Sequence, residues 1–169
     1  MPNAAALYFL TGSLASGKTT LLARVAQKYP ALWTGHVDAA GSLGRGVEWV
    51  ALAADPPPQR PPLLVVDGQE RPHVMLEAAR RAGLPHFHVV LIDCGHEERR
   101  RRLIEERKQP EWDKLDTYAW AAYLRGQADA LGLEIIDTTS RPLEDSVAEL
   151  AASIERFARA AGVSPALSA

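Results

Sequence analysis

The chain has 169 residues, 47% of them hydrophobic, and 19 Lys and Arg against 21 Asp and Glu give a formal net charge of -2 at pH 7. This composition supports a sizeable core, and the near-neutral charge predicts no general attraction to nucleic acid or to an anionic membrane. The single cysteine, Cys94, excludes an internal disulfide, and no apolar stretch approaches the ~20 residues that a membrane span needs. We therefore expect one cytoplasmic domain over residues 1–161, followed by a flexible tail over 162–169.

The first predicted elements surround a motif. Residues 6–11 are a short apolar run that predicts a buried strand, and residues 12–19 read Gly-Ser-Leu-Ala-Ser-Gly-Lys-Thr. This is a complete G-x-x-x-x-G-K-[ST] phosphate loop, and residues 18–29 continue it with apolar residues at helical spacing. Strand, loop and helix therefore occur in the order that phosphate binding requires.

Each residue type in this loop has a physical role toward nucleotide. Gly12 and Gly17 permit backbone angles that let successive amides turn toward phosphate oxygens, while the helix N-terminus adds partial positive charge. Lys18 supplies a mobile charge with a catalytic role, and the hydroxyl of Thr19 is a ligand for Mg²⁺. The predicted ATP-binding residues are Gly12, Ser13, Leu14, Ala15, Ser16, Gly17, Lys18, Thr19 and Thr20.

Strands and helices then alternate along the chain. The apolar runs predict further strands at 32–38 (a weak candidate, interrupted by Gly35), 63–67, 87–93 and 133–137. Helical spacing predicts helices at 71–82, 97–107, 113–131 and 143–160. Such repetition predicts an α/β fold, the three-layer P-loop NTPase architecture, with a five-stranded parallel sheet and helices on both faces.

Asp67 is the second chemical landmark. It ends the most hydrophobic predicted strand, Leu63-Leu64-Val65-Val66, where a carboxylate can reach the Mg²⁺ held by Thr19, usually through a water. This is the pattern of a Walker B aspartate. The alternative is that Asp67 only caps the following turn.

The residues after Asp67 read Gly68-Gln69-Glu70-Arg71, which completes an Asp-Gly-x-x-Arg sequence. With the phosphate loop, this resembles the small P-loop kinases, the group of nucleoside monophosphate kinases, gluconate kinase and shikimate kinase. In nucleoside monophosphate kinases the arginine of a similar sequence contacts the phosphate of the acceptor. The resemblance therefore implies a substrate-binding role for Arg71.

An arginine-dense segment runs from Glu97 to Glu111. Guanidinium donors that close over a transferring phosphoryl group stabilise its developing charge, and the resembling kinases carry such arginines on this helix and on a short lid. We expect a lid around 99–112 with Arg107 as the first catalytic candidate and Arg102 and Arg99 as the next, because residues three or four apart share a helix face. The alternative is a solvated face of Glu and Arg ion pairs.

The acceptor side is less defined. In the resembling kinases an Asp after the second strand orients the attacking hydroxyl, and Asp38 occupies that place, followed by Arg45 as a candidate anion contact. The alternative is a flexible Gly-rich loop whose Trp49 packs on the core. The Pro-rich residues 55–62 are expected to be extended, which leaves little room for a nucleotide-binding insertion and favours a small or partly exposed acceptor.

Several other features allow two interpretations. Thr139 and Arg141 follow the last predicted strand, in a loop that lies near the adenine in the resembling kinases, and are candidate base contacts. His86 and His88 could share a strand face, but no third metal ligand has recognisable spacing. The aromatic residues of the 113–131 region are expected to be core, with substrate stacking as the alternative; they are Trp112, Tyr118, Trp120 and Tyr123.

Together these patterns predict an ATP-dependent phosphotransferase. ATP and Mg²⁺ would be held by residues 12–19 and Asp67, and the γ-phosphoryl group would move to a small-molecule acceptor, a nucleotide, sugar or similar hydroxyl or phosphate compound. One alternative is a nucleotide-dependent ATPase switch or binding module without an acceptor, although no Asn-Lys-x-Asp guanine signature is present. A polynucleotide 5′-kinase is disfavoured by the charge balance. The oligomeric state is not predicted.

Overall fold

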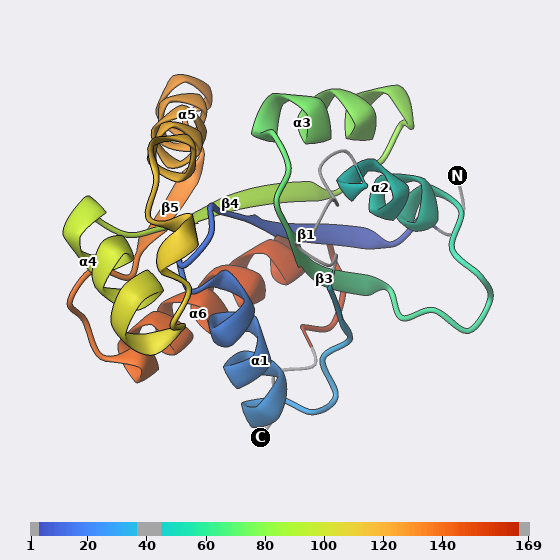
Figure 1. The fold of residues 1–169 in the computed structure, drawn as a ribbon. Helices are drawn as coiled ribbons and strands as arrows, with labels where there is room; N and C mark the ends of the chain where they lie inside the picture. Colours follow the sequence, from blue (N-terminus) through green and yellow to red (C-terminus); the bar gives the residue numbers. More distant parts are fainter. Residues whose placement is uncertain (1–3, 37–44, 166–169) are drawn as a thin grey trace.

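The computed structural model describes residues 4–36 and 45–165. They form a five-stranded parallel sheet in the order β2-β3-β1-β4-β5 (Figure 1). The strands are β1 (Ala6–Thr11), β2 (Thr34–His36), β3 (Leu63–Gly68), β4 (Phe87–Asp93) and β5 (Glu134–Asp137). Since all strands run parallel, their carboxyl ends lie at one edge of the sheet.

Helices cover both faces of this sheet (Figure 1). The α-helices are α1 (Lys18–Lys28), α2 (Gly46–Ala54), α3 (Pro72–Arg81), α4 (His96–Arg101), α5 (Leu115–Leu131) and α6 (Leu143–Ala160). A π-helical turn, Arg102–Glu106, continues α4, and a 3₁₀ turn, Pro110–Trp112, precedes α5. Helices α1 and α6 lie on one face, and α2, α3 and α5 lie on the other, which makes three layers.

The alternation of side chains along β1 explains the two cores. Tyr8 and Leu10 pack into the cluster that includes residues of α1 and α6, whereas Leu7 and Phe9 pack into the cluster with residues of α2 and α3. All six residues of β1 are buried, as expected for the central strand of a sheet that is covered on both faces. The predicted α/β three-layer P-loop NTPase fold is confirmed.

Residues 46–54 form α2, a helix that was not predicted, and the alternative interpretation of this region as a Gly-rich loop is wrong for these residues. The sequence gives little sign of this helix, because its N-cap residue, Arg45, is not one of the preferred capping residues. The Arg45 side chain accordingly makes no capping hydrogen bond. Trp49 of α2 packs edge-on against Trp33, with ring centroids 5.7 Å apart. A Cβ at Gly35 would lie 2.8 Å from the Trp49 ring, so this glycine permits the close approach of helix and strand. The packing of Trp49 on the core was the alternative interpretation, and it is confirmed.

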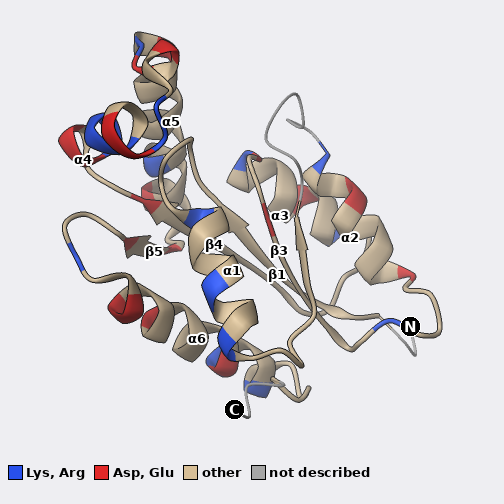
Figure 2. Cartoon of the chain, turned by 60° about the horizontal axis from the view of Figure 1, so that its bottom comes forward, with Lys and Arg blue, Asp and Glu red and all other residues tan. Residues whose placement is uncertain are grey.

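The region around α4 differs from the single predicted helix over 97–107. From Arg102 the helix changes to π-type, and the Arg107 N–H donates to the Arg102 carbonyl at 2.8 Å. Pro110 then stops the continuation, so the 3₁₀ turn separates this segment from α5. Acidic and basic residues lie close together along α4, where two glutamates are followed by three arginines (Figure 2). Within residues 4–36 and 45–165, every helix is too short or too polar to cross a membrane.

Candidate functional site

The phosphate loop joins β1 to α1 at the carboxyl edge of the sheet. Gly17, the residue before α1, has a φ of 97°, which a residue with a Cβ adopts only with strain. A Cβ at Gly12 would lie only 2.4 Å from the carbonyl oxygen of Ile92 on β4, so the loop can pack this closely on the sheet only with glycine there. Gly17 thus provides the backbone conformation that the sequence suggests, whereas Gly12 is needed for close packing on β4 and not for a positive φ.

Two polar side chains of this loop, those of Lys18 and Ser16, are buried. The Lys18 side chain is almost fully buried, at 6% exposure. Burial lowers the pKa of Lys18 to about 8; the Asp67 carboxylate opposes this effect, and the positive charges of Arg107 and Arg99 add to it. The buried Ser16 hydroxyl has no hydrogen-bond partner among the described residues. A buried cation and an unused hydroxyl are the arrangement that an anionic ligand would complete.

Asp67 connects the loop to the neighbouring strands. This carboxylate is 1% exposed, and its Oδ2 accepts a hydrogen bond from Thr19 Oγ1 at 2.8 Å. Its Oδ1 lies 2.5 Å from Nδ1 of His36, the last residue of β2. A hydroxyl and a carboxylate side by side are the hard oxygen ligands that Mg²⁺ prefers, so the predicted metal-binding residues fit such an ion.

His36 was not predicted as a site residue. The pairing register of β2 and β3 places His36 beside Asp67. Its partner could be found only once the neighbour and register of β2 were known, and the sequence of this short strand defines neither.

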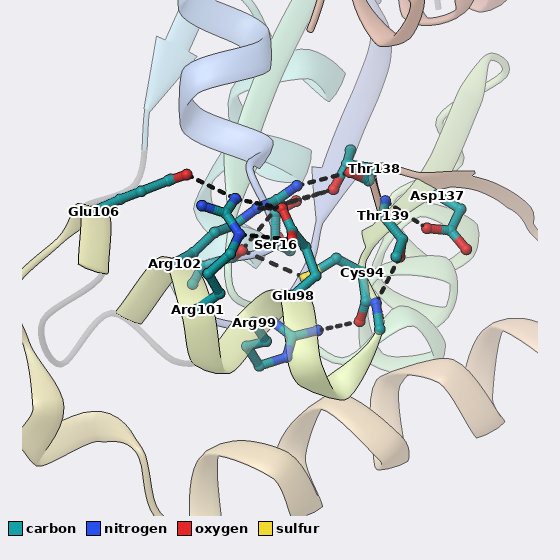
Figure 3. Close-up of polar contacts among 12 residues, drawn as sticks. Ser16, Cys94, Glu98, Arg99, Arg101, Arg102, Glu106, Asp137, Thr138 and Thr139 are labelled. Atoms are coloured by element: carbon teal, nitrogen blue, oxygen red, sulfur yellow. Dashed lines mark hydrogen bonds and ion pairs between the residues drawn. The ribbon is translucent and has the colours of Figure 1, made fainter. Parts of the chain in front are cut away.

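Arg99 and Arg102 both reach the phosphate loop, as expected for residues on one helix face, but they contact protein groups there (Figure 3). Arg99 is 1% exposed; it donates to the Asp93 carboxylate at 2.7 Å and to the Leu14 carbonyl at 2.5 Å. Arg102 donates to the carbonyls of Ala15 and Ser16, both at 3.2 Å. These bonds hold the backbone of the loop, and a direct catalytic role of either arginine stays a prediction.

Arg102 also ties the loop to the end of β5. It donates to the Thr138 hydroxyl at 3.0 Å and to the Thr138 carbonyl at 2.7 Å (Figure 3). The Thr138 hydroxyl in turn donates to the Ser16 carbonyl at 2.7 Å. On its other side Arg102 pairs with Glu98 at 2.8 Å, and Arg101 pairs with the same carboxylate. Because of these two arginines, the pKa of Glu98 falls to about 2, although partial burial opposes the shift.

A cavity of about 390 Å³ lies between the phosphate loop, the π-helical turn and the loop after β5. Arg107 lines it together with Gly17, Thr20, Arg101 and Arg141. Arg107 is exposed, and its Nε donates only to Gln109 at 2.9 Å, so most of its donors remain free for a ligand. Thr139 lies elsewhere: it accepts a bond from the Gly95 N–H at 2.7 Å and lines a second cavity on the other side of Glu98.

The acceptor-side predictions fall on separate elements. Asp38 lies outside the described residues. Arg45 is exposed before α2 and pairs with Glu48 at 3.3 Å. Arg71 is the N-cap of α3 and lines an open groove of about 400 Å³ with Asp116, Ala119, Trp120 and Tyr123 of α5. The structure therefore brings Arg71 together with aromatic residues that sequence reasoning had assigned mainly to the core.

The remaining candidates contribute to packing. His88 pairs with Glu134 at 3.1 Å, which lowers the pKa of that carboxyl. No group of three His, Cys, Asp or Glu side chains within residues 4–36 and 45–165 is placed to hold a metal ion. Cys94 is buried with its thiol 3.5 Å from the Ala15 carbonyl, and burial raises its pKa. Tyr118 stacks on His96 with ring centroids 3.9 Å apart.

The sheet order, the glycine-dependent loop between β1 and α1, and the Thr19–Asp67 contact define the P-loop NTPase class of fold. No family model and no curated protein sequence matches the chain. Among solved structures, the chain is similar to shikimate kinase from Acinetobacter baumannii in complex with shikimate, with a TM-score of 0.56 and 15% identity over 91% of this chain and 95% of that one.

Two further solved structures are similar over most of their length. A gluconokinase from Sinorhizobium meliloti 1021 gives a TM-score of 0.58 with 11% identity, covering 95% of this chain and 97% of that one. The YorR protein of Bacillus subtilis, in complex with phosphorylated GDP, gives 0.60 with 12% identity, covering 89% and 96%. The chain thus has the fold of the small P-loop kinases, as the motifs predicted.

Proposed function

We propose that this protein is an ATP-dependent phosphotransferase that moves the γ-phosphoryl group of MgATP to a small-molecule acceptor. The observation that carries the proposal is the incomplete polar site in the phosphate loop, where the Lys18 side chain is buried and the buried Ser16 hydroxyl has no hydrogen-bond partner among the described residues. Bound phosphates would interact with both side chains. The kinases with this fold support the direction of the proposal.

The nucleotide would occupy the phosphate loop and the neighbouring cavity. Backbone amides of residues 12–17 and the Lys18 ammonium would hold the phosphates. Thr19 and Asp67 would hold Mg²⁺, which when bound neutralises charge on the β- and γ-phosphates. Arg141 and the lid arginines line the cavity beyond, where the base and ribose would lie.

The transfer itself needs an acceptor oxygen and groups that stabilise the transferring phosphoryl. The acceptor oxygen forms a bond to the γ-phosphorus as the bond to the bridging β–γ oxygen breaks; ADP leaves, and the proton of a hydroxyl acceptor passes to water. Arg107 is the lid arginine with free donors, so it would stabilise the developing charge. Asp38, Arg45 and Arg71 are the proposed acceptor-side residues, with Asp38 orienting the attacking hydroxyl.

ADP release and ³¹P NMR with an acceptor panel test this function. The panel contains sugar acids, hydroxy acids, nucleosides and nucleoside monophosphates, each incubated with MgATP. We expect at least one compound to accelerate ADP release and to yield a phosphorylated product, and Lys18→Ala to abolish both. Slow ATP hydrolysis that no acceptor accelerates would instead favour the nucleotide switch.

A further inference from the structure

The groove beside Arg71 has two walls, and both are tied to the phosphate loop. Arg71 follows Glu70, whose backbone carbonyl accepts a hydrogen bond of 2.7 Å from the Thr11 hydroxyl, directly before Gly12. On the other wall, the carbonyl of Thr117 in the first turn of α5 accepts a bond of 3.4 Å from Ser13 of the loop. The groove therefore lies next to the site where the proposed function places the γ-phosphate.

The α5 wall of the groove is aromatic. Trp120 and Tyr123 stack on each other with ring centroids 5.5 Å apart and an interplanar angle of 18°. Trp120 is anchored because it packs against the small core cluster of Leu91, Leu124 and Ala128, whereas Tyr123 is 39% exposed. The two rings offer a fixed surface on which a planar group can stack at low entropic cost.

Two charged side chains, Arg71 and Asp116, line the groove beside these rings. Arg71 is half-buried and Asp116 is exposed, and neither side chain forms an ion pair or hydrogen bond with any described residue. In the Glu- and Arg-rich segment of α4, by contrast, nearly every arginine has a carboxylate partner. The Arg71 guanidinium is thus a free, partly desolvated cation next to an aromatic surface.

We infer that the acceptor of this phosphotransferase is a planar aromatic compound that carries an anionic group, a carboxylate or a phosphate. Its ring lies against Trp120 and Tyr123, Arg71 binds the anion, and Asp116 accepts a hydrogen bond from a polar ring substituent. The inference rests on the proposed function, which gives the bound compound its role as acceptor. Binding of the compound to the groove does not itself depend on phosphoryl transfer. An uncharged or saturated ring would use only part of this surface.

Calorimetry without nucleotide tests the groove by itself. The probes are meta-(hydroxymethyl)benzoate, its cyclohexane analogue and uncharged benzene dimethanol, and meta-(hydroxymethyl)phenyl phosphate distinguishes the two anions. We expect the aromatic acid or the aromatic phosphate to bind about threefold to tenfold tighter than the saturated acid, the range that an aromatic contact supplies. The uncharged diol should bind more weakly still, because the charge-assisted contact is lost.

Two variants and a matched control locate the binding. Arg71→Ala should weaken the anionic probes by about tenfold or more and leave the diol unchanged. Tyr123→Ala should remove the preference for the aromatic ring while keeping the preference for the anion. Leu131→Ala, an exposed position at the far end of α5, is the control and should bind like the wild type. Thermal melts of all variants check that they are folded.

The outcomes separate this inference from the proposed function. Binding with these preferences but without ³¹P transfer from MgATP would support the groove and overturn the phosphotransferase. Transfer to a compound of another class, unaffected by Arg71→Ala and Tyr123→Ala, would support the phosphotransferase and overturn the groove. Equal binding of all probes, or no binding of any, would also overturn the assignment of the groove as the acceptor site. Self-association of the chain that Tyr123→Ala abolishes would overturn it as well.

Discussion

The hydroxyl of Thr19 donates a 2.8 Å hydrogen bond to Asp67, across 48 residues of sequence, and so joins the end of the phosphate loop to β3. The other oxygen of the same carboxylate is held by His36. Both Asp67 oxygens therefore have fixed positions before any ligand binds. Such preorganisation is what a site for a small, strictly coordinated ion requires.

Asp67→Asn should weaken the response to Mg²⁺ more than the binding of metal-free ATP. The amide keeps the shape of the side chain but loses the negative charge that favours the cation. The measurement is activity, or ATP affinity, against Mg²⁺ concentration for both proteins. Superimposable Mg²⁺ curves would return Asp67 to the alternative role of capping the turn after β3.

Lys18→Ala should lose MgATP-dependent turnover while the protein stays folded. The Lys18 side chain is buried, and its removal also relieves the desolvation of its charge, which offsets part of the lost packing, whereas bound phosphates would lose a cation of the loop. ATP titration by calorimetry, together with a turnover assay and a thermal melt, checks this. Turnover equal to that of the wild type would remove Lys18 from the mechanism.

Arg107→Ala should lower kcat by about 10² or more, with a much smaller effect on ATP affinity. Arg107 lines the cavity beside the phosphate loop, and its only side-chain partner among the described residues is Gln109. Arg107→Lys should restore only part of the rate, since lysine keeps the charge but lacks the planar fork of donors. Steady-state rates at saturating ATP show whether Arg107 has this catalytic role, and the measurement requires that an acceptor is identified first.

A surface arginine outside the lid provides the comparison. Arg80 on α3 is a surface arginine outside the site, and Arg80→Ala should leave kcat unchanged. A wild-type kcat in Arg107→Ala would return this segment to the solvated-face interpretation and move the catalytic assignment to Arg102 or Arg99.

Arg99→Met should destabilise the fold, by about 3–5 kcal/mol if the effect is that of breaking a buried ion pair. The change removes the donor of Asp93 Oδ1 and of the Leu14 carbonyl, and it leaves the Asp93 carboxylate with the longer 3.5 Å bond from Arg125. Urea unfolding measures the loss, and Arg100→Met, on an exposed neighbouring position, is the control. If Arg99→Met unfolds at the same urea concentration as the wild type but loses activity, Arg99 acts on phosphate and not on the loop.

The sequence was sufficient where a role depends on neighbours along the chain. The phosphate loop needs its glycines, lysine and threonine at fixed spacing, and Asp67 ends a strand that is recognisable from its apolar residues alone. The contact of His36 with Asp67 depends on the pairing of two strands, which a three-residue strand cannot specify. The groove likewise required the packing of α3 beside α5, a relation between distant segments that leaves no periodic signal.

The roles of the lid arginines show the same limit within one helix. Helical spacing predicted that Arg99 and Arg102 share a face, and they do. The spacing did not show that this face lies against loop carbonyls, nor that a π-helical turn would replace the α-helix before Arg107. The sequence therefore predicts the arginine-rich segment, but the role of each arginine within it depends on tertiary packing.

The pKa of Glu98 gives a prediction about pH. Its two arginine partners lower that pKa from 4.5 to about 2 in the folded protein. A carboxyl with a depressed folded pKa stabilises the fold fully above its unfolded pKa, and this contribution is lost as the pH falls toward the folded pKa. Glu98→Gln should therefore be less stable than the wild type at pH 7, and the difference should shrink as the pH falls from about 4.5 toward 2.

Urea unfolding at a series of pH values measures this difference in stability, with Glu105→Gln, an exposed position on the same segment, as the control. A stability difference that stays constant from pH 7 to pH 3 would show that Glu98 acts through packing and not through its charge pairs with Arg101 and Arg102.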